Sequence, residues 1–253
     1  GTGNYNEKTA RLYTDFHLLT AHQDIGIDVN NVFHVMMTNT IDVERTYPQL
    51  LVAPHSLKQS LLKLIDEEID YHQQYKNGLI ILKFNSLTDL QLIEALIKAS
   101  KAGVKIKMII RGICCLIPNV KGETENIEIT SIVGRYLEHS RYYYFYHNAQ
   151  EKMYLSSADW MTRNMERRIE VACPILDEKN KVKLKELIQV HFEDTENSYR
   201  LDKDNEYKKV TSDLKINLHQ DLYSLLAKTK TNVYKQKEQT SFFENLLKII
   251  TNH

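Results

Sequence analysis

The chain has 253 residues, enough for one large domain or two modest ones with a buried core. Its 33 basic residues balance 33 acidic ones, so net charge offers no long-range attraction to nucleic acid or a membrane, and an anion site has to be built locally. No apolar run is long enough to cross a bilayer, and three cysteines without C-x-x-C spacing favour a reduced, cytoplasmic setting.

The sequence opens on small and polar residues, GTGNYNEKTAR, at positions 1–11. Roughly the first 45 residues carry too little hydrophobic periodicity to form a fold of their own. The chain also begins at Gly1 rather than at methionine. We therefore expect this polypeptide to be the latter part of a longer protein, with an upstream half outside the given sequence.

The clearest architecture begins at residue 50. The run LLVAP at 50–54 predicts a short buried strand that ends at a proline. Ser56, with Gln59 three residues later, forms a capping-box pattern and predicts the start of a helix. The apolar face of this helix is expected to consist of Leu57, Leu61, Leu64, Ile65 and Ile69.

A strand, a helix and another strand follow. The runs LIILKF at 79–84 and VKIKMIIRG at 104–112 predict the two strands. Thr88 and Gln91 form a second capping-box pattern at the start of the helix between them. The alternation of strands and helices over about 60 residues indicates right-handed βαβ units on a mostly parallel sheet.

Four further segments are rich in β-formers. They are NIEITSIV, HSRYYYFYH, KMYLSS and RIEVACPIL, and a helix from about residue 177 to 192 closes the region. The aromatic run at 142–146 can be read as a base-stacking platform, but a strand that packs on both faces of a sheet is the favoured interpretation. The predicted fold class is α/β, with a mixed sheet flanked by helices.

The pattern weakens after residue 198. Residues 199–253 are rich in lysine and asparagine, with amphipathic stretches in LHQDLYSLLAK and FFENLLKII. We expect this segment to be a peripheral helical tail rather than a further domain.

Two segments of the chain repeat one motif. The opening GTGNYNEKTAR and the later SSADWMTRNMERR both place small residues before Asn or Asp, an aromatic residue and a polar run. The second copy follows His139 and Arg141 by one predicted hairpin, whereas the strand that should precede the first copy lies before residue 1. The repeat predicts two similar half-sites that face each other.

This layout resembles the phospholipase D superfamily, whose motif is His-x-Lys followed by a Gly-Ser-x-Asn-like cluster. An imidazole can attack phosphorus or protonate a leaving oxygen, and flanking cations and hydroxyl or amide donors neutralise phosphoryl oxygens. The sequence departs from that motif in two ways, because Arg141 replaces the lysine and Tyr146 stands where an aspartate is usual. Both departures count against a phospholipase or nuclease.

Within the superfamily the chain is similar to the C-terminal catalytic half of bacterial polyphosphate kinases. The similarity rests on GTGNYNEKTARLYTDF, NSLTD, AGVKIKMIIRGICCLIP, SIVGRYLEHSR and YLSSADWMTRN. It implies that residues 1–49 end a first phospholipase D-like catalytic domain, that residues 50–198 form the second, and that residues 199–253 are the tail.

The resemblance implies reversible transfer of the terminal phosphate of ATP to inorganic polyphosphate. ATP and Mg²⁺ are the implied cofactors, with most metal contacts upstream of residue 1, so no metal ligand is assigned in this chain. The implied phosphohistidine also lies upstream, and this chain alone is expected to be inactive. The implied partners are ATP or ADP and polyphosphate, without nucleic acid; a homo-oligomer and peripheral membrane association of the full-length protein are compatible with it.

The resemblance also implies roles for particular residues. His139 is the expected catalytic residue, as either proton donor or phosphate ligand, and Arg141 beside it is an expected phosphate ligand. Arg111, at the end of a predicted strand, is expected to bind ATP phosphates. Tyr13 is the candidate for nucleotide contact, although an ordinary half-buried strand tyrosine is nearly as good an interpretation.

The small polar clusters supply three more candidates. Asn4 and Ser157 are expected to shape the phosphate site and donate hydrogen bonds to it, and local turn chemistry is the alternative. For Asp159, a local turn role and the orientation of a partner such as His139 are equally good interpretations. Direct phosphate contact is disfavoured, because phosphate repels a carboxylate.

Two other functions remain open from sequence alone. One is a different phospholipase D-like phosphotransfer enzyme that acts on a phosphodiester. The other is a non-catalytic module that binds polyphosphate.

Overall fold

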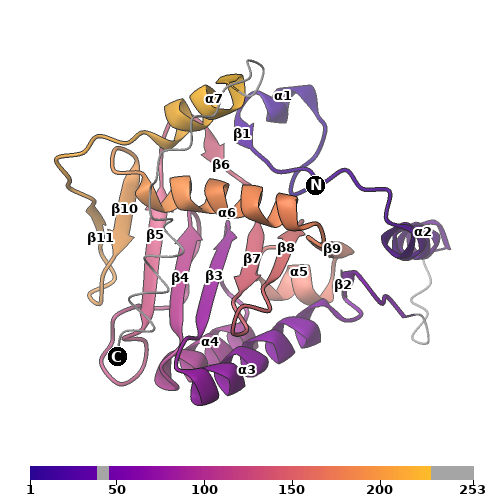
Figure 1. Cartoon of the computed structure of the whole chain (residues 1–253), viewed down its shortest axis with the longest axis horizontal. Helices are drawn as coiled ribbons and strands as arrows, with labels where there is room; N and C mark the ends of the chain where they lie inside the picture. The colour runs from indigo at the N-terminus through magenta and orange to yellow at the C-terminus, as the bar shows by residue number, and fades with distance from the viewer. Residues whose placement is uncertain (39–45, 229–253) are drawn as a thin grey trace.

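A nine-stranded mixed β-sheet lies at the centre of the molecule (Figure 1). The computed structural model describes residues 1–38 and 46–228. The sheet order is β11-β10-β5-β4-β3-β7-β8-β9-β2, and a separate ribbon pairs β1 with β6 in parallel. The strands are β1 (Tyr13–Thr14), β2 (Leu51–Ala53), β3 (Leu79–Phe84), β4 (Lys105–Ile110), β5 (Ile127–Ile132), β6 (Leu137–Glu138), β7 (Tyr142–Phe145), β8 (Lys152–Ser156), β9 (Glu170–Pro174), β10 (Ser198–Leu201) and β11 (Tyr207–Lys209).

Helices cover both faces of the sheet. α3 and α4 pack on one face, α6 crosses the other, and α7 lies beside α6 near the β1–β6 ribbon (Figure 1). No helix in the described part of the chain is long and apolar enough to span a membrane. The helices are α1 (Glu7–Ala10), α2 (Gln23–Thr38), α3 (Leu57–Tyr75), α4 (Leu90–Lys101), α5 (Thr162–Glu166), α6 (Glu178–Glu193) and α7 (Leu218–Lys228).

The central strands bury side chains on both faces. In β3, Ile80 and Leu82 join the cluster under α3 and α4, whereas Leu79 and Ile81 join the cluster under α6. The aromatic run of β7 alternates in the same way and is fully buried. The strand interpretation of this run is therefore confirmed, as is the fold class of a mixed α/β sheet flanked by helices.

The sheet is less parallel than the sequence predicted. The β3–β4 pairing is parallel, as the βαβ rhythm requires, and the β4–β5 pairing is parallel as well. The other six pairings of the nine-stranded sheet are antiparallel, and β2 pairs with β9 at the far edge. The prediction of a mostly parallel sheet is wrong because short connections, such as the β7–β8 hairpin, join antiparallel neighbours.

The two predicted capping boxes are not formed as expected. Ser56 precedes α3, but its side chain caps none of the N–H groups of that helix. α4 is capped by Asp89, whose carboxylate accepts the N–H of Leu92 at 3.2 Å. The N–H groups of Thr88 and Asp89 both bond to the carbonyl oxygen of Trp160, which holds Thr88 outside the helix.

The segment after residue 198 is only partly helical. β10 pairs with β5 and extends the sheet, and β11 pairs with β10. Leu201 of β10 is buried in the core cluster that also contains residues of α3 and α4. The prediction of a helical tail is therefore wrong for this stretch, although α7 is a helix. The predicted stretch FFENLLKII lies outside the described residues.

Strands β3, β4 and β8 are among those that end at one edge of the sheet. β3 and β4 are parallel, and β8 runs in their direction because β7, antiparallel to both β3 and β8, lies between them. Their carboxyl ends therefore share an edge with the amino end of β7. The β1–β6 ribbon lies over this edge (Figure 1). Ligands of open α/β sheets bind outside the carboxyl ends of strands, so this edge positions the candidate site.

Candidate functional site

The His139 imidazole lies between the carboxylate of Asp15 and the guanidinium of Arg141. Its Nδ1 lies 2.9 and 3.1 Å from the two carboxylate oxygens of Asp15, and its Nε2 lies 3.3 Å from Nη2 of Arg141. Since a guanidinium only donates, these contacts fit a neutral ring that donates from Nδ1 and accepts at Nε2. The Tyr13 ring lies beside the imidazole, with centroids 4.9 Å apart.

Asp15 is fixed from the chain's opening residues. Thr2 donates its hydroxyl to the Asp15 carboxylate at 2.7 Å. A Cβ atom on Gly3 would overlap that carboxylate, so glycine allows the backbone to approach it closely. Burial raises the pKa of Asp15, but the bonds from His139 and Thr2 outweigh burial and leave this pKa below its usual value. Asp15 is therefore a carboxylate that can stabilise a charged imidazole.

The Arg141 guanidinium is saturated by protein groups. Its Nε and Nη2 bond to the two oxygens of Asp159 at 2.8 and 3.2 Å. Nη1 donates to the carbonyl oxygens of Thr2 and His139, and Nη2 also faces the imidazole. All five N–H groups have partners, so direct phosphate binding by Arg141 requires one of these bonds to be exchanged.

Asp159 organises this edge rather than contacting a ligand. Besides Arg141, one of its oxygens accepts the backbone N–H of Asn85 at 2.7 Å and the side-chain amide of Asn85 at 3.0 Å. Burial raises the pKa of Asp159, but the hydrogen bonds and charge of Arg141, together with Asn85, hold it below the ordinary value. Of the two predicted roles, orientation of a partner fits, and that partner is Arg141.

Arg111 is anchored at one end and free at the other. Its Nε lies 2.7 Å from both the Asn85 side-chain oxygen and the carbonyl oxygen of Glu138. Within the described residues neither Nη atom makes a hydrogen bond, so this half of the fork is available to an anion. Gly112 lets the chain turn here, because a Cβ on it would lie 2.7 Å from the Asn85 carbonyl oxygen.

Asn4 and Ser157 make bonds elsewhere. The Asn4 side-chain oxygen accepts the Thr9 hydroxyl at 2.6 Å, next to α1. Ser157 donates to Glu170 and accepts the N–H of Val171 at 3.1 Å, across β9. Both sets of bonds correspond to the local alternative, and phosphate contact by Asn4 and Ser157 stays a prediction.

Three residues of the site were missed in the sequence. Asn85 follows β3 just as Arg111 follows β4, so the strand-end rule that selected Arg111 also applied to it. Asp15 lies two residues after Tyr13 and therefore on the same side of an extended segment. Thr2 carried no comparable signal.

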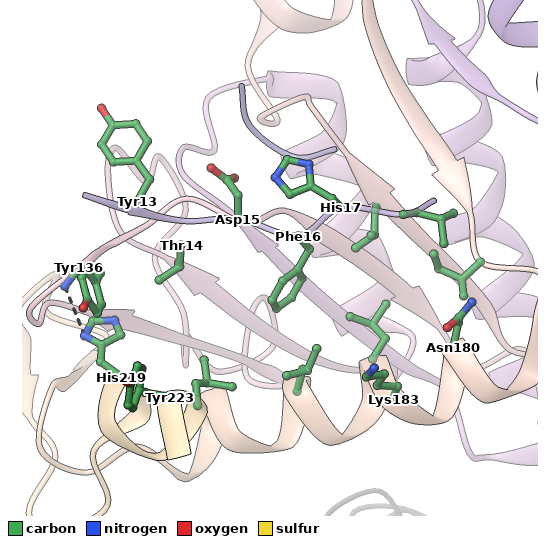
Figure 2. Close-up of a pocket in the computed structure, with 16 residues that line it drawn as sticks. Tyr13, Thr14, Asp15, Phe16, His17, Tyr136, Asn180, Lys183, His219 and Tyr223 are labelled. Carbon is green, nitrogen blue, oxygen red and sulfur yellow. Dashed lines mark hydrogen bonds between the residues drawn. The ribbon is translucent and has the colours of Figure 1, made fainter. Parts of the chain in front are cut away.

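A cavity of about 530 Å³ lies beneath residues 13–18 (Figure 2). Tyr13 and Asp15 point away from α6 and α7, whereas Phe16 points toward these helices (Figure 2). The opposite wall includes Leu184 and Leu187 of α6 and Leu222 of α7. The alternation turns Phe16 toward the mainly apolar side of this cavity, whereas Asp15 bonds to His139.

Metal binding finds no ready site in this region. The described residues contain no group of three or more His, Cys, Asp or Glu side chains able to hold a metal ion. The carboxylates of Asp15 and Asp159 are both occupied, Asp15 by His139 and Thr2 and Asp159 by Arg141 and Asn85. These residues do not fit a protein-held Mg²⁺.

Comparisons with known proteins agree on one family. Residues 50–220 match the model of "Polyphosphate kinase C-terminal domain 2", and residues 1–42 match "Polyphosphate kinase C-terminal domain 1". A polyphosphate kinase of Bacillus anthracis is 51% identical over 207 residues, which are 82% of this chain and 29% of that protein. One of Staphylococcus haemolyticus is 46% identical over 214 residues, 85% of this chain and 29% of that protein.

A solved structure shows the same arrangement. The crystal structure of polyphosphate kinase from Porphyromonas gingivalis aligns with a TM-score of 0.86 at 36% identity. The alignment covers 91% of this chain and 36% of that chain. The chain thus spans less than a third of the length of the two curated relatives described above.

Proposed function

This chain belongs to the polyphosphate kinase family, and from that premise we propose that it is the C-terminal part of an enzyme that transfers the terminal phosphate of ATP reversibly to inorganic polyphosphate. In the first step the bond between the γ-phosphorus and the ADP oxygen breaks as a bond to a histidine nitrogen forms. In the second step a terminal oxygen of polyphosphate attacks that phosphorus and displaces the histidine. We place this nucleophilic histidine outside the present chain.

The observation that carries the proposal is the convergence of His139 and Arg111 at one sheet edge. Arg111 presents its unbonded Nη atoms there, and a guanidinium fork suits the paired oxygens of a phosphate. His139 belongs to the same hydrogen-bond network, which runs from Arg111 through Asn85, Asp159 and Arg141. These groups could neutralise charge on a phosphoryl group during transfer.

We assign His139 the role of a donor to a phosphoryl oxygen. In the neutral ring Nε2 accepts from Arg141, so it cannot also donate. A protonated ring would donate from Nε2, and the Asp15 carboxylate at Nδ1 stabilises that positive charge. Tyr13, beside the imidazole, is then placed to contact the nucleotide.

Magnesium, as Mg²⁺, is expected to arrive with the phosphates of ATP. When bound, it would neutralise phosphate charge. No step is assigned to it through the residues of this chain, because the carboxylates near His139 are already paired. Without the proposed upstream nucleophile, the present chain alone is expected to make no polyphosphate.

The test uses the natural protein with γ-labelled ATP. We expect an acid-labile, base-stable phosphohistidine and chain growth of polyphosphate, both ATP-dependent. His139→Ala should reduce polymer synthesis by about a hundredfold or more. His34→Ala is the matched control, since His34 lies exposed on α2 away from the site. Normal synthesis by His139→Ala would contradict the role given to this residue.

A further inference from the structure

A cluster of buried ionisable side chains lies beneath the site and has no part in the proposed chemistry. Glu138, Lys83, His191 and His219 come from β6, β3, α6 and α7, and none exposes more than 6% of its surface. Buried charges are costly unless they are paired and hydrogen-bonded. Four such groups at the meeting point of four elements therefore call for a structural reason.

Glu138 is the centre of this cluster. Its Oε2 lies 3.1 Å from Nζ of Lys83 and 3.2 Å from Nε2 of His191. Its Oε1 accepts from Nε2 of His219 at 2.8 Å. The other two hydrogens of Lys83 go to the carbonyl and hydroxyl oxygens of Ser140, both at 2.8 Å. Lys83 thus has no hydrogen left for a phosphate.

The hydrogen bonds also fix the states of the two histidines. Nδ1 of His219 accepts the backbone N–H of Tyr136 at 3.4 Å, so this ring is neutral and donates from Nε2. Nδ1 of His191 lies 2.7 Å from the carbonyl oxygen of Leu187, and its Nε2 faces Glu138. Both oxygens only accept, so His191 can bond to both of them only when each of its ring nitrogens carries a hydrogen.

The charge balance of the cluster depends on Glu138. The Glu138 carboxylate is shared between Lys83 and His191. Burial raises the pKa of Glu138, but Lys83 and the two histidines outweigh burial and hold it well below the usual range. The carboxylate is thus kept ionised inside the protein.

The main chain at Glu138 connects to both functional residues. Its carbonyl oxygen accepts Nε of Arg111 at 2.7 Å, and the next residue is His139. β6 has only two residues and lies outside the nine-stranded sheet, where it pairs with β1. Such a short ribbon provides little stability by itself. The Glu138 side chain is where this ribbon is fastened to β3, α6 and α7.

We propose that Glu138 is a positioning residue, whose clamped carboxylate holds His139 and Arg111 at the spacing that a phosphoryl group requires. The inference rests on the proposed function for the identity of the ligand. It assigns α7 to the support of the site through His219, although the sequence indicated a peripheral tail.

The first experiment changes one atom of the carboxylate. Glu138→Gln in the natural protein keeps the size of the side chain but turns an NH₂ toward Lys83 or a histidine. We expect kcat for polyphosphate synthesis to fall by about tenfold to a hundredfold, since small misplacements of reacting groups have effects of this order. The ¹⁵N resonances of the His139 ring should shift in the same variant.

Glu151→Gln is the matched control. Glu151 also pairs with a lysine, Lys185 at 3.0 Å, and accepts the hydroxyl of Tyr144 at 2.9 Å, but it contacts no residue of the site. The Glu151→Gln variant should leave kcat and the His139 resonances unchanged. A folded Glu138→Gln protein with normal kcat and normal His139 resonances would overturn the proposal.

A second pair of variants remains decisive if Glu138→Gln does not fold. His219→Gln retains an N–H that can reach Glu138, whereas His219→Leu removes it. We expect His219→Leu to lower kcat and to shift the ¹⁵N resonances of His139. In His219→Gln, both kcat and these resonances should stay close to those of the unmodified protein. Equal behaviour of the two variants contradicts the proposal.

The experiment separates this inference from the proposed function. If the natural protein makes no polyphosphate, the proposed function fails, while the ring resonances of His139 still test the positioning. If synthesis is normal but the His139 resonances are the same in the Glu138 and His219 variants as in the unmodified protein, only the positioning role of Glu138 is contradicted.

Discussion

Nδ1 of His139 lies 2.9 Å from the carboxylate of Asp15, although 124 residues separate the two in sequence. The contact exists because β1 and β6 pair, with Thr14 opposite Glu138. It joins the opening segment of the chain to the candidate catalytic residue. This acid–imidazole pair is the arrangement that orients a histidine and stabilises its charged form.

Asp15→Asn should therefore weaken catalysis more than nucleotide binding. The amide cannot stabilise a protonated imidazole, and it can turn an NH₂ toward Nδ1. We expect kcat for polyphosphate synthesis in the natural protein to fall by about tenfold to a hundredfold, with a smaller change in KM for ATP. Asp24→Asn, on the exposed start of α2, is the control. A variant with unchanged kcat would show that the pair has no role in transfer.

Arg111→Lys should produce the opposite pattern. Lysine keeps the charge but cannot bond to both Asn85 and Glu138 while still offering a two-pronged donor to phosphate. We expect KM for ATP to rise by about tenfold, measured in steady-state synthesis assays. Arg200→Lys, at an exposed position of β10, should bind ATP normally. Equal KM values for the Arg111 variant and the unmodified protein would remove Arg111 from the phosphate site.

Asp159→Asn should mainly affect stability. It leaves the buried guanidinium of Arg141 without its carboxylate, which typically lowers the free energy of unfolding by about 3 kcal/mol. Asp66→Asn breaks an exposed pair with Lys98 and should lower it by less than about 1 kcal/mol. Urea unfolding at pH 7 makes this comparison, and similar losses in both variants would contradict the buried pair's importance.

The same variant has a defined pH dependence. The pKa of Asp159 is lower in the folded protein than its ordinary value of 3.8, so its contribution to stability is present above pH 3.8 and is lost as pH falls through the folded-state pKa. The stability difference between the unmodified protein and Asp159→Asn should therefore shrink on acidification below about pH 4. A constant difference down to pH 2.5, in urea titrations, would be inconsistent with this pair.

Local hydrophobic pattern was enough to predict the central elements. The run LIILKF is apolar throughout because both faces of β3 are covered, and the apolar residues of α3 recur at helical spacing because one side faces the sheet. The place of Arg111 after a strand left a surface role and a phosphate-binding role about equal, and the family resemblance of its surroundings favoured phosphate binding. These signals lie within a few residues of the feature that they predict.

The contacts that complete the site depend on long-range pairing. β1 and β6 have two residues each, too few for any periodicity, so the contact between Asp15 and His139 could not be inferred. Glu138 reads as a surface residue in RYLEHSR, and its partners Lys83 and His219 lie 55 residues upstream and 81 downstream. Burial of a charge is decided by these distant partners and has no local signature.

The contribution of Glu68 to the free energy of unfolding changes with pH in the opposite direction to that of Asp159. This glutamate is buried under the β7–β8 hairpin, where it accepts the backbone N–H groups of Leu79 and His147 at 2.9 Å each. Burial raises the pKa of its carboxyl from 4.5 to about 7, although these hydrogen bonds lower it. Its favourable contribution is therefore complete below about pH 4.5 and is lost as pH rises to about 7.

Glu68→Gln removes this titration, because the amide is neutral throughout. Relative to the unmodified protein, the variant should gain about 2–3 kcal/mol of unfolding free energy between pH 5 and pH 8, since one pKa unit corresponds to about 1.4 kcal/mol. Glu94→Gln, on the exposed face of α4, controls for loss of a helical carboxylate. Urea unfolding at half-unit pH steps measures both. A flat difference for Glu68→Gln would mean that its two backbone donors keep the carboxylate ionised despite burial.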